Sequence, residues 1–259
     1  MRRTVETDDH ALARELAEEA GGLLLRLRED LSGDAPTLGE RGDRESHAFL
    51  MQRLAADRPG DAVLSEEGRD DEARLTASRV WIIDPLDGTR EFGEVPRDDW
   101  AVHIALWEGG AIVAGAVARP ARGDTLATGL PISVPPRPAA PAPLRLAVSR
   151  SRPPVFVGRL AERLGAELVP MGSAGIKATA VVDGVVDAYI HAGGQYEWDS
   201  AAPVAVARAA GLHTSRIDGS PLAYNREDPS LPDLLICRPE VAPTLLASIQ
   251  ELNSEETRA

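Results

Sequence analysis

Apolar side chains near the amino terminus recur with helical spacing. Between residues 8 and 30 they fall every three or four positions, which predicts one amphipathic helix. A second helix is expected to begin at Asp43, because its side chain suits an N-cap. Phe49, Leu50 and Leu54 would then share the apolar side of that helix.

Short apolar segments follow, and two of them end directly in acidic residues. Residues 62–64 and 79–83 are typical of short strands, and residues 100–106 alternate as strand residues do. The pair Gly109-Gly110 predicts a hairpin turn before a returning strand at residues 111–118. Because functional sites are often built where strands end, the acidic residues there are candidates for chemistry.

A proline-rich segment separates this part of the chain from the remainder. Six prolines fall among small residues between positions 129 and 143, which predicts a semi-rigid extended connector. Beyond it, predicted strands and helices alternate as in α/β proteins, and Gly211 is expected to end one helix. The predicted strands cover residues 144–149, 167–170, 185–190 and 233–237, and the predicted helices cover residues 155–164, 173–182, 199–210 and 239–252. We therefore expect an α+β lobe at residues 1–143 and an α/β lobe at residues 144–259.

Composition places the chain among ordinary globular proteins, since 43% of its 259 residues are apolar and 27% are charged. Asp and Glu number 41 against 28 Lys and Arg, which gives a net charge of -13. Such a surface repels nucleic-acid phosphates and anionic lipids, so we expect neither nucleic acid nor a membrane as a partner. An anionic substrate would need a local source of positive charge, such as bound divalent cations.

Cysteine content and apolar runs bear on location. The single cysteine, Cys237, permits no intrachain disulfide and fits a reducing compartment. The first residues lack the apolar region of a secretory signal, and the longest apolar run, residues 111–118, is too short to span a bilayer. We therefore expect a cytoplasmic protein.

Asp84 and Asp87 form the most informative motif. The predicted strand delivers Asp84 at its end, and Pro85 restricts the backbone that follows. Asp87 comes within one turn, so both carboxylates can face one small volume, an arrangement of hard oxygen ligands that suits Mg²⁺. Gly88 permits close approach of the backbone, and the amides around it would open a helix whose N-terminus favours phosphate. The alternative interpretation is an ordinary turn with an N-cap.

Two further acidic segments lie far from this motif in the sequence. Glu66 and Glu67 end another predicted strand, where adjacent carboxylates are unfavourable unless cations or solvent relieve them; alone, they are typical of a solvated loop. Asp199 lies at the start of a predicted helix, where an N-cap is the simple interpretation. His103 lies in a strand pattern and is interpreted as a core histidine rather than a ligand.

In combination, these motifs resemble the signature of the inositol monophosphatase superfamily of lithium-sensitive, Mg²⁺-dependent phosphatases. The matching motifs are Asp84-Pro-Leu-Asp-Gly-Thr89, the Glu66-Glu67 pair and Glu197-Trp-Asp-Ser-Ala-Ala202. Within the superfamily, Pro85-Leu-Asp-Gly-Thr-Arg-Glu-Phe92 looks like the 3'(2'),5'-bisphosphate nucleotidase branch, the bacterial CysQ type, and residues 172–203 resemble its actinobacterial members. The resemblance implies a layered αβαβα sandwich of the inositol monophosphatase/fructose bisphosphatase type, with the active site between the two lobes.

The resemblance also implies a metal site. Glu66, Asp84 and the Leu86 carbonyl would hold one Mg²⁺ ion. Asp84, Asp87 and Asp199 would hold a second, and a third ion is an alternative.

Catalytic and substrate-binding roles follow from the same resemblance. Thr89 and Asp43 would orient the attacking water, with Glu66 as a further catalytic residue, and the amides of Gly88 and Thr89 would receive the scissile phosphate. The implied substrate contacts are Leu86, Asp87, Gly88, Thr89, Ser173, Lys177 and Asp199.

The implied reaction removes the 3'-phosphate of adenosine 3',5'-bisphosphate to give AMP, with 3'-phosphoadenylyl sulfate as a further substrate. In sulfate-assimilating cells this reaction would clear a by-product of sulfonucleotide metabolism. The resemblance also implies inhibition by lithium and a homodimer.

Several residues leave the substrate open. Lys177, the only lysine, would grip a second phosphate, or it is an exposed helix lysine. Arg152 stands where the nucleotidase branch has histidine, and residues 172–177 are one residue longer than the pattern of that branch. Inositol 1-phosphate or fructose 1,6-bisphosphate is therefore an alternative substrate. A non-catalytic metal-binding module is disfavoured, because Leu86 and Gly88 occupy positions where an EF-hand loop needs oxygen ligands.

Overall fold

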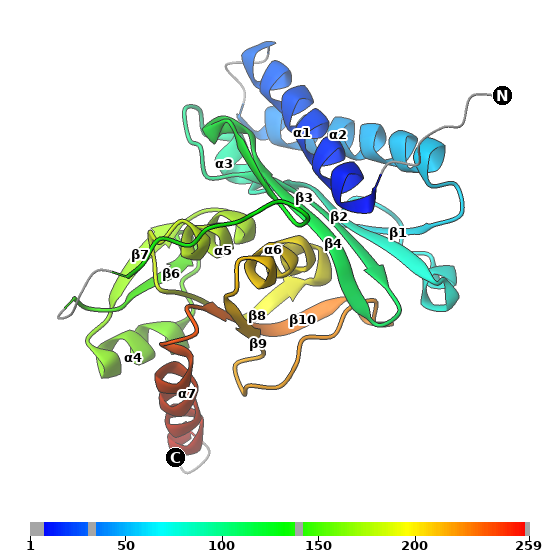
Figure 1. The fold of residues 1–259 in the computed structure, drawn as a ribbon. Helices are drawn as coiled ribbons and strands as arrows, with labels where there is room; N and C mark the ends of the chain where they lie inside the picture. Colours follow the sequence, from blue (N-terminus) through cyan, green and yellow to red (C-terminus); the bar gives the residue numbers. More distant parts are fainter. Residues whose placement is uncertain (1–7, 31–34, 138–141, 257–259) are drawn as a thin grey trace.

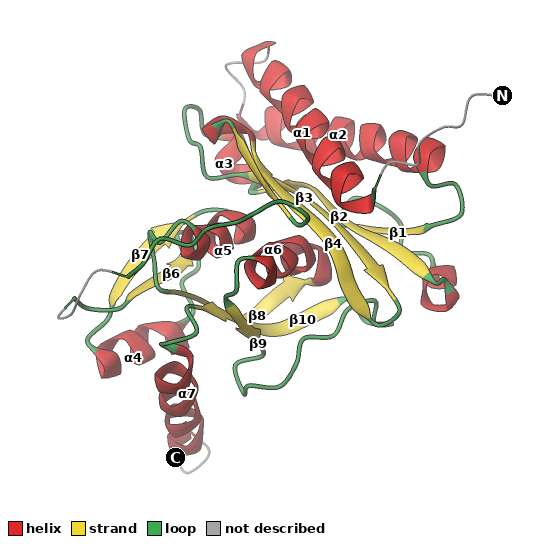
Figure 2. Cartoon of the chain, in the orientation of Figure 1, coloured by secondary structure: helices red, strands yellow, loops and turns green. Residues whose placement is uncertain are grey.

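Two five-stranded sheets alternate with three layers of helices in the computed structural model, which describes residues 8–30, 35–137 and 142–256 (Figure 1). The outer layers and the layer between the sheets each contain a pair of long helices (Figure 2). In order across the molecule, these pairs are α1 (Asp9–Asp30) with α2 (Ala35–Asp57), α5 (Ala174–Val182) with α6 (Glu197–Ala209), and α4 (Val155–Leu164) with α7 (Ala242–Glu256). The expected αβαβα sandwich is confirmed.

The first sheet has the order β1-β2-β3-β4-β5, in which β1 and β2 are parallel and the other pairs are antiparallel. Its strands are β1 (Ala62–Ser65), β2 (Arg79–Asp87), β3 (Ala101–Glu108), β4 (Ala111–Arg119) and β5 (Asp124–Ala127). The two short strands and the hairpin were predicted, whereas β5 was not. Short helices α3 (Thr89–Gly93), η1 (Glu72–Thr76) and η2 (Pro120–Arg122) lie between strands.

Alternation along β2 shows why its sequence is apolar throughout. Trp81 and Ile83 pack with α1 and α2, whereas Val80 and Ile82 pack in the central core with α5 and α6. A strand covered by helices on both faces needs apolar side chains at odd and even positions alike. Asp84 is therefore the first polar residue at the end of a fully buried segment.

The second sheet has the order β7-β6-β8-β10-β9. Its strands are β6 (Arg145–Ser149), β7 (Glu167–Met171), β8 (Ala188–Tyr196), β9 (His213–Ser215) and β10 (Ser230–Cys237). β8 continues to Tyr196, six residues beyond its predicted end, and passes directly into α6. β9 was not predicted, but Gly211 follows α6 with a φ of 77°, as expected of a residue that ends a helix.

The start of α2 corrects the sequence prediction. The helix begins at Ala35 rather than at Asp43, which lies in its interior and is not an N-cap. Close packing explains the difference, because Gly39 and Gly42 let the first turns approach Thr89 and Leu86. A Cβ at Gly42 would lie 2.8 Å from a Leu86 methyl group, so tertiary contact outweighs the low helix propensity of glycine.

The proline-rich segment connects the two sheets along the chain, since β5 of the first sheet precedes it and β6 of the second sheet follows it. Residues 131–137 and 142–144 have no regular secondary structure, and residues 138–141 lie outside the described residues, as do residues 1–7 and 257–259 of the predicted lobes. One hydrophobic cluster contains Ile82 of the first sheet together with Ile236 of the second. The division into lobes at residue 143 stays a prediction.

Candidate active site

The motif that begins at Asp84 lies where β2 departs from regular pairing with β3. Asp84 is opposite His103, but the register shifts before Asp87, which is opposite Ala101. This irregularity turns both carboxylates toward one volume, as bulges near functional sites commonly do. Asp84 is 1% exposed and Asp87 is 7% exposed. The N–H of Leu86 donates to Asp84 Oδ1 at 3.1 Å, which fixes the turn.

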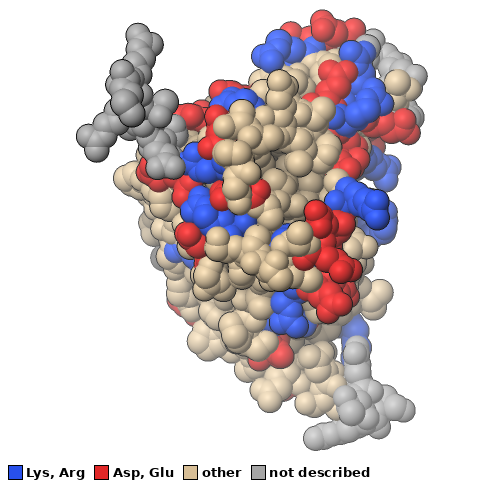
Figure 3. Space-filling model, turned by 90° about the vertical axis from the view of Figure 1, so that its right-hand side faces the viewer, with Lys and Arg blue, Asp and Glu red and all other residues tan. Residues whose placement is uncertain are grey.

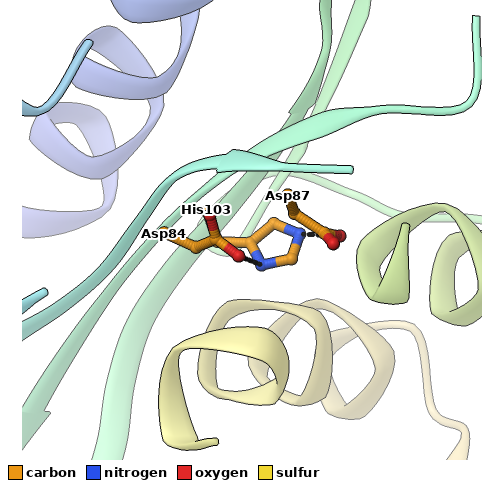
Figure 4. A group of neighbouring side chains, drawn as sticks. All are labelled: Asp84, Asp87 and His103. Atoms are coloured by element: carbon orange, nitrogen blue, oxygen red, sulfur yellow. Dashed lines mark ion pairs between the residues drawn. The ribbon is translucent and has the colours of Figure 1, made fainter. Parts of the chain in front are cut away.

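The imidazole of His103 lies between these two carboxylates (Figure 4). Its Nδ1 is 3.8 Å from Asp84 Oδ2, and its Nε2 is 3.1 Å from Asp87 Oδ2. Burial lowers the pKa of His103, but the charge of Asp87 outweighs burial and leaves that pKa above its ordinary value. His103 is buried, as expected of a core histidine, yet it contacts both acids of the motif. Sequence analysis missed this, because the register of β2 against β3 cannot be read from the residues alone.

Asp87 is also held by the first residues of α5. The N–H groups of Ala174 and Gly175 donate to its two oxygens at 3.0 and 2.7 Å, and the Ser173 hydroxyl donates to Oδ2. Burial raises the pKa of Asp87, but the contact with His103 and the hydrogen bond from Ser173 hold it well below its usual range. Asp87 therefore stays ionised at every physiological pH.

Glu66 follows the end of β1 and lies beside Asp84. β1 and β2 are parallel and pair Ser65 with Ile83, so the next residue of each strand emerges at the same edge of the sheet. As a whole residue Glu66 is exposed, but its carboxyl group shares a hydrogen bond with that of Asp84, which requires a proton on one of the two groups. Loss of hydration and the charge of Asp199 raise the pKa of Glu66 to about 7. Burial and the charge of Glu66 raise the pKa of Asp84 well above its usual range.

Asp199 reaches the acidic group from α6. The interpretation of Asp199 as an N-cap is wrong, because Tyr196 is the N-cap and Asp199 is the third residue of the helix. Asp199 Oδ2 accepts a hydrogen bond from the Tyr196 N–H at 2.7 Å. Burial and the charge of Asp87 raise the pKa of Asp199 to about 6. A helix that caps itself in this way fixes the position of the Asp199 carboxylate.

Asp43 and Thr89 come together as expected from the resemblance. Thr89 Oγ1 lies 3.2 Å from Asp43 Oδ1 and 3.3 Å from the carbonyl oxygen of Leu86. Burial and the charge of Glu67 raise the pKa of Asp43 to about 7. The interior of α2, not its beginning, thus supplies the carboxylate that meets the start of α3.

Gly88 occupies a position that only glycine adopts readily. Its φ is 91°, and it forms the N-cap of α3. A Cβ at this position would lie 3.2 Å from the carbonyl oxygen of Asp99. Asp99 is a further residue that sequence analysis missed: its Oδ2 accepts a hydrogen bond from the Gly172 N–H at 2.7 Å, which ties the two sides of the site together.

A pocket of about 440 Å³ opens beside Asp87 and Asp199. Its walls are the loop at residues 149–154, the start of α5 and the β8 residues from Tyr189 to Gln195. Lys177 lines this pocket and is 6% exposed, so the alternative of an exposed helix lysine is wrong.

The acidic group fits a divalent cation. Among the described residues, ligand atoms of Asp84, Asp87 and His103 lie within 4.8 Å of one another. Glu66 and Asp199 lie outside this tighter group but interact with it electrostatically. Burial and the repulsion of neighbouring carboxylates raise the pKa values of both groups, and a bound cation would relieve that repulsion. Carboxylate oxygens are ligands that Mg²⁺ prefers.

Acidic and basic side chains share the molecular surface. On the face drawn in Figure 3, basic side chains lie among acidic ones and form no continuous basic surface. In the part of the chain that the structure describes, no helix combines the length and the apolar character that a membrane span needs.

Comparison with known proteins establishes the class. The model of the inositol monophosphatase family matches residues 5–254. CysQ from Bacteroides thetaiotaomicron, described as a bacterial member of that family, has a TM-score of 0.72 and 27% identity, covering 92% of this chain and 99% of that one. The chain belongs to the inositol monophosphatase family.

Within the family, two mycobacterial relatives are considerably more similar. The chain is 54% identical to the 3'-phosphoadenosine 5'-phosphate phosphatase of Mycobacterium leprae, over 95% of each protein. It is 57% identical to the protein of the same name from Mycobacterium bovis, over 90% of each.

Proposed function

We propose that this protein is a metal-dependent phosphomonoesterase that removes the 3'-phosphate of adenosine 3',5'-bisphosphate and releases AMP. The observation that carries the proposal is the convergence of carboxylates from the ends of β1 and β2 and the start of α6, around His103 and beside a pocket. Identities of 54% and 57% to relatives named for 3'-phosphoadenosine 5'-phosphate support the choice of substrate.

The proposed metal is Mg²⁺. Glu66, Asp84 and the Leu86 carbonyl would hold one ion, and Asp84, Asp87 and Asp199 would hold a second, with a third ion as an alternative. When bound, the ions would offset the charge of the phosphoryl group and promote ionisation of the attacking water. The pKa of Asp84, which burial and the charge of Glu66 raise well above its usual range, supports this assignment.

Thr89 and Asp43 are proposed to orient the attacking water. Asp43 Oδ1 would accept the hydroxyl proton of Thr89 across 3.2 Å, which leaves a lone pair of Thr89 Oγ1 for a hydrogen bond from water. Glu66 is the third catalytic residue in the proposal, because it is the exposed member of the acidic group.

The phosphate is proposed to bind at the start of α3. The amides of Gly88 and Thr89 would donate to its oxygens, since the absent side chain of Gly88 permits close approach. The remaining proposed contacts are Leu86, Asp87, Ser173, Lys177 and Asp199; all but Leu86 line the pocket.

Further expectations of the resemblance belong to the same proposal. Lithium would inhibit by displacing one Mg²⁺ ion, and the protein would form a homodimer. The single cysteine, Cys237, is buried and unpaired, which supports a reducing, cytoplasmic location.

The proposal is tested with the purified protein in the presence of Mg²⁺. We expect kcat/KM for adenosine 3',5'-bisphosphate to exceed the values for inositol 1-phosphate and fructose 1,6-bisphosphate by about tenfold or more. A tenfold preference for either of the other substrates would overturn the choice of substrate. If no phosphomonoester released phosphate in a Mg²⁺-dependent reaction, the enzymatic proposal itself would fail.

A further inference from the structure

The short helix α3 depends on other elements for its position. It has five residues, Thr89–Gly93, and a helix of that length has little stability of its own in water. Its first residue nevertheless has to keep Thr89 Oγ1 3.2 Å from Asp43 Oδ1, the contact that is proposed to orient the attacking water. The contacts that hold α3 therefore bear directly on the alignment of that water.

Phe92 anchors α3 on its buried side. Its ring meets the ring of Trp100 edge-on, with centroids 4.9 Å apart, and both side chains are completely buried. A Cβ added at Gly42 would lie 2.9 Å from the Phe92 ring, so α2 packs directly against it. A Cβ added at Gly88 would lie 3.3 Å from Trp100 Cα. The two rings therefore connect α3 with the segment that contacts Gly88.

Arg28, in the last turn of α1, covers both rings. Its Cζ lies 5.6 Å from the centroid of the Phe92 ring and 5.6 Å from that of the Trp100 ring, within the range of a cation–π interaction. Its Nη2 donates to the carbonyl oxygen of Glu91 at 3.4 Å, near the carboxyl end of α3, where a positive charge is favourable. One guanidinium thus contacts both a side chain and the backbone of α3.

The surroundings of Arg28 differ from those of a surface arginine. Its side chain is half-buried, and its Nε has no hydrogen-bond partner among the described residues. Burial lowers the pKa of Arg28, and the charges of Asp98 and Asp99 do not offset that effect. Arg26, two residues earlier on α1, is exposed by contrast. Because burying a guanidinium with an unpaired donor is unfavourable, the contacts with α3 are the ones that account for the position of Arg28.

We propose that Arg28 is a positioning residue, which fixes α3 against α1 and so keeps Thr89 at Asp43. A displacement of about 1 Å at a group that aligns a reactant can lower the rate about 100-fold, so a modest loosening of α3 would reach kcat. The inference rests on the proposed function and adds to it a residue that belongs neither to the acidic group nor to the pocket wall.

The test measures kcat and KM for adenosine 3',5'-bisphosphate at saturating Mg²⁺. Arg28→Met keeps an apolar chain over the rings but removes the charge and the donor. We expect this variant to lower kcat by about tenfold or more and to change KM by less than about twofold. Arg28→Lys keeps a cation and a donor and should recover part of kcat. The matched control is Arg26→Gln, which removes an exposed arginine of the same helix and should change neither quantity.

A double-mutant cycle separates positioning from a purely structural role. If Arg28 acts through Thr89, Arg28→Met should lower kcat strongly in the wild type and only slightly in Thr89→Ala, which has already lost the group that aligns the water. A structural role would lower kcat by the same factor in both backgrounds. If Arg28→Met did not fold, Arg28→Gln, which keeps a donor without the charge, would replace it in the cycle.

The outcomes also distinguish this inference from the proposed function. Equal factors in the two backgrounds would overturn the inference and leave the proposed function intact. An unchanged kcat in the Arg28 variant would do the same, even if its Tm fell or its KM rose. A wild type that preferred another phosphomonoester would overturn the choice of substrate only, because the cycle can be measured with that ester. A wild type that released phosphate from no phosphomonoester would overturn the proposed function, and the inference with it.

Discussion

Gly175 lies against His103 so closely that a Cβ added to it would stand 2.1 Å from His103 Nε2. The imidazole is completely buried between Asp84 and Asp87, so it cannot move away from a methyl group added at Gly175 without disturbing these contacts. The N–H of Gly175 also donates to Asp87 Oδ2 at 2.7 Å. Glycine at this position therefore lets the N-terminus of α5 reach the acidic group of the first sheet.

Gly175→Ala should disturb stability and activity together. The added methyl group must displace His103 or α5, and we expect a loss of about 2 kcal/mol in the free energy of unfolding. The matched control is Gly158→Ala in α4, where a Cβ would meet nothing within 4 Å. That variant should be neutral or more stable by up to about 1 kcal/mol, because alanine favours a helix. Urea titration of both proteins makes the comparison, and equal free energies of unfolding would contradict the packing argument.

Asp84→Asn should separate activity from stability. Asparagine keeps the Oδ1 acceptor for the Leu86 N–H, but it removes a carboxylate whose charge is opposed by those of its neighbours. We expect Mg²⁺-dependent activity to fall by at least about 100-fold. The metal-free variant should unfold at the wild-type temperature or above it. Glu167→Gln, which removes an exposed carboxylate at the start of β7, is the control and should keep its activity. Wild-type activity in Asp84→Asn would remove Asp84 from the proposed metal site.

The acidic group also predicts how pH acts on the metal-free protein. Folding raises the pKa of Asp43 and Glu66 to about 7 and that of Asp199 to about 6, from usual values near 4. At pH values between the usual pKa and the raised pKa of these three groups, the folded state binds more protons than the unfolded state. Their contribution to the free energy of unfolding therefore falls as pH rises through this range. Above about pH 5 Asp87 adds almost no slope, because it is then ionised in the unfolded state as well as in the folded state, where its pKa is lowered.

Thermal unfolding with and without Mg²⁺ at pH 5 and pH 8 measures this linkage. Mg²⁺ competes with protons for the same carboxylates, so the rise in Tm that it produces should be larger at pH 8 than at pH 5. Titrations of all other groups are common to both conditions and cancel in the difference. A rise in Tm that did not depend on pH would show that Mg²⁺ binds somewhere other than at these carboxylates.

The sequence was sufficient for the features that depend on local pattern. Short apolar segments predicted β2 and β4, and alternation predicted β3. The motif at Asp84 pointed to the centre of the candidate site in combination with the distant acidic segments, because alone it also fits an ordinary turn. The layered sandwich came from the family resemblance rather than from these patterns. The same resemblance predicted the contact between Asp43 and Thr89, which the structure contains. The separate prediction that Asp43 is an N-cap was wrong, because Asp43 lies inside α2.

Features that depend on register or tertiary packing could not be predicted. The contact of His103 with both acids follows from a shift in the pairing of β2 with β3, and a shift of one residue would turn the imidazole to the opposite face. The early start of α2 depends on glycines that pack against distant residues. Asp199 was taken for an N-cap because nothing in the local sequence shows that β8 continues to Tyr196.

Arg74 of η1 connects the segment after Glu66 with the segment that supports α6. It is 1% exposed, and its guanidinium donates to Asp70 Oδ1 at 2.6 Å and to Asn225 Oδ1 at 2.8 Å. The N–H of Asn225 in turn donates to Glu197 Oε2 at 2.6 Å, in the first turn of the helix that carries Asp199. One chain of hydrogen bonds thus links elements that supply two of the proposed metal ligands.

Arg74→Met should therefore weaken both the fold and the response to metal. Methionine fills part of the space but leaves buried acceptors unpaired, and we expect a loss of about 3 kcal/mol in the free energy of unfolding. Because the segments that carry Glu66 and Asp199 are then no longer tied together, the rise in Tm produced by Mg²⁺ should also be smaller than in the wild type. Arg69→Met removes an exposed arginine five residues earlier and should change neither quantity. If Arg74→Met lowered stability but kept the full rise in Tm with Mg²⁺, the link between Arg74 and the metal site would be refuted.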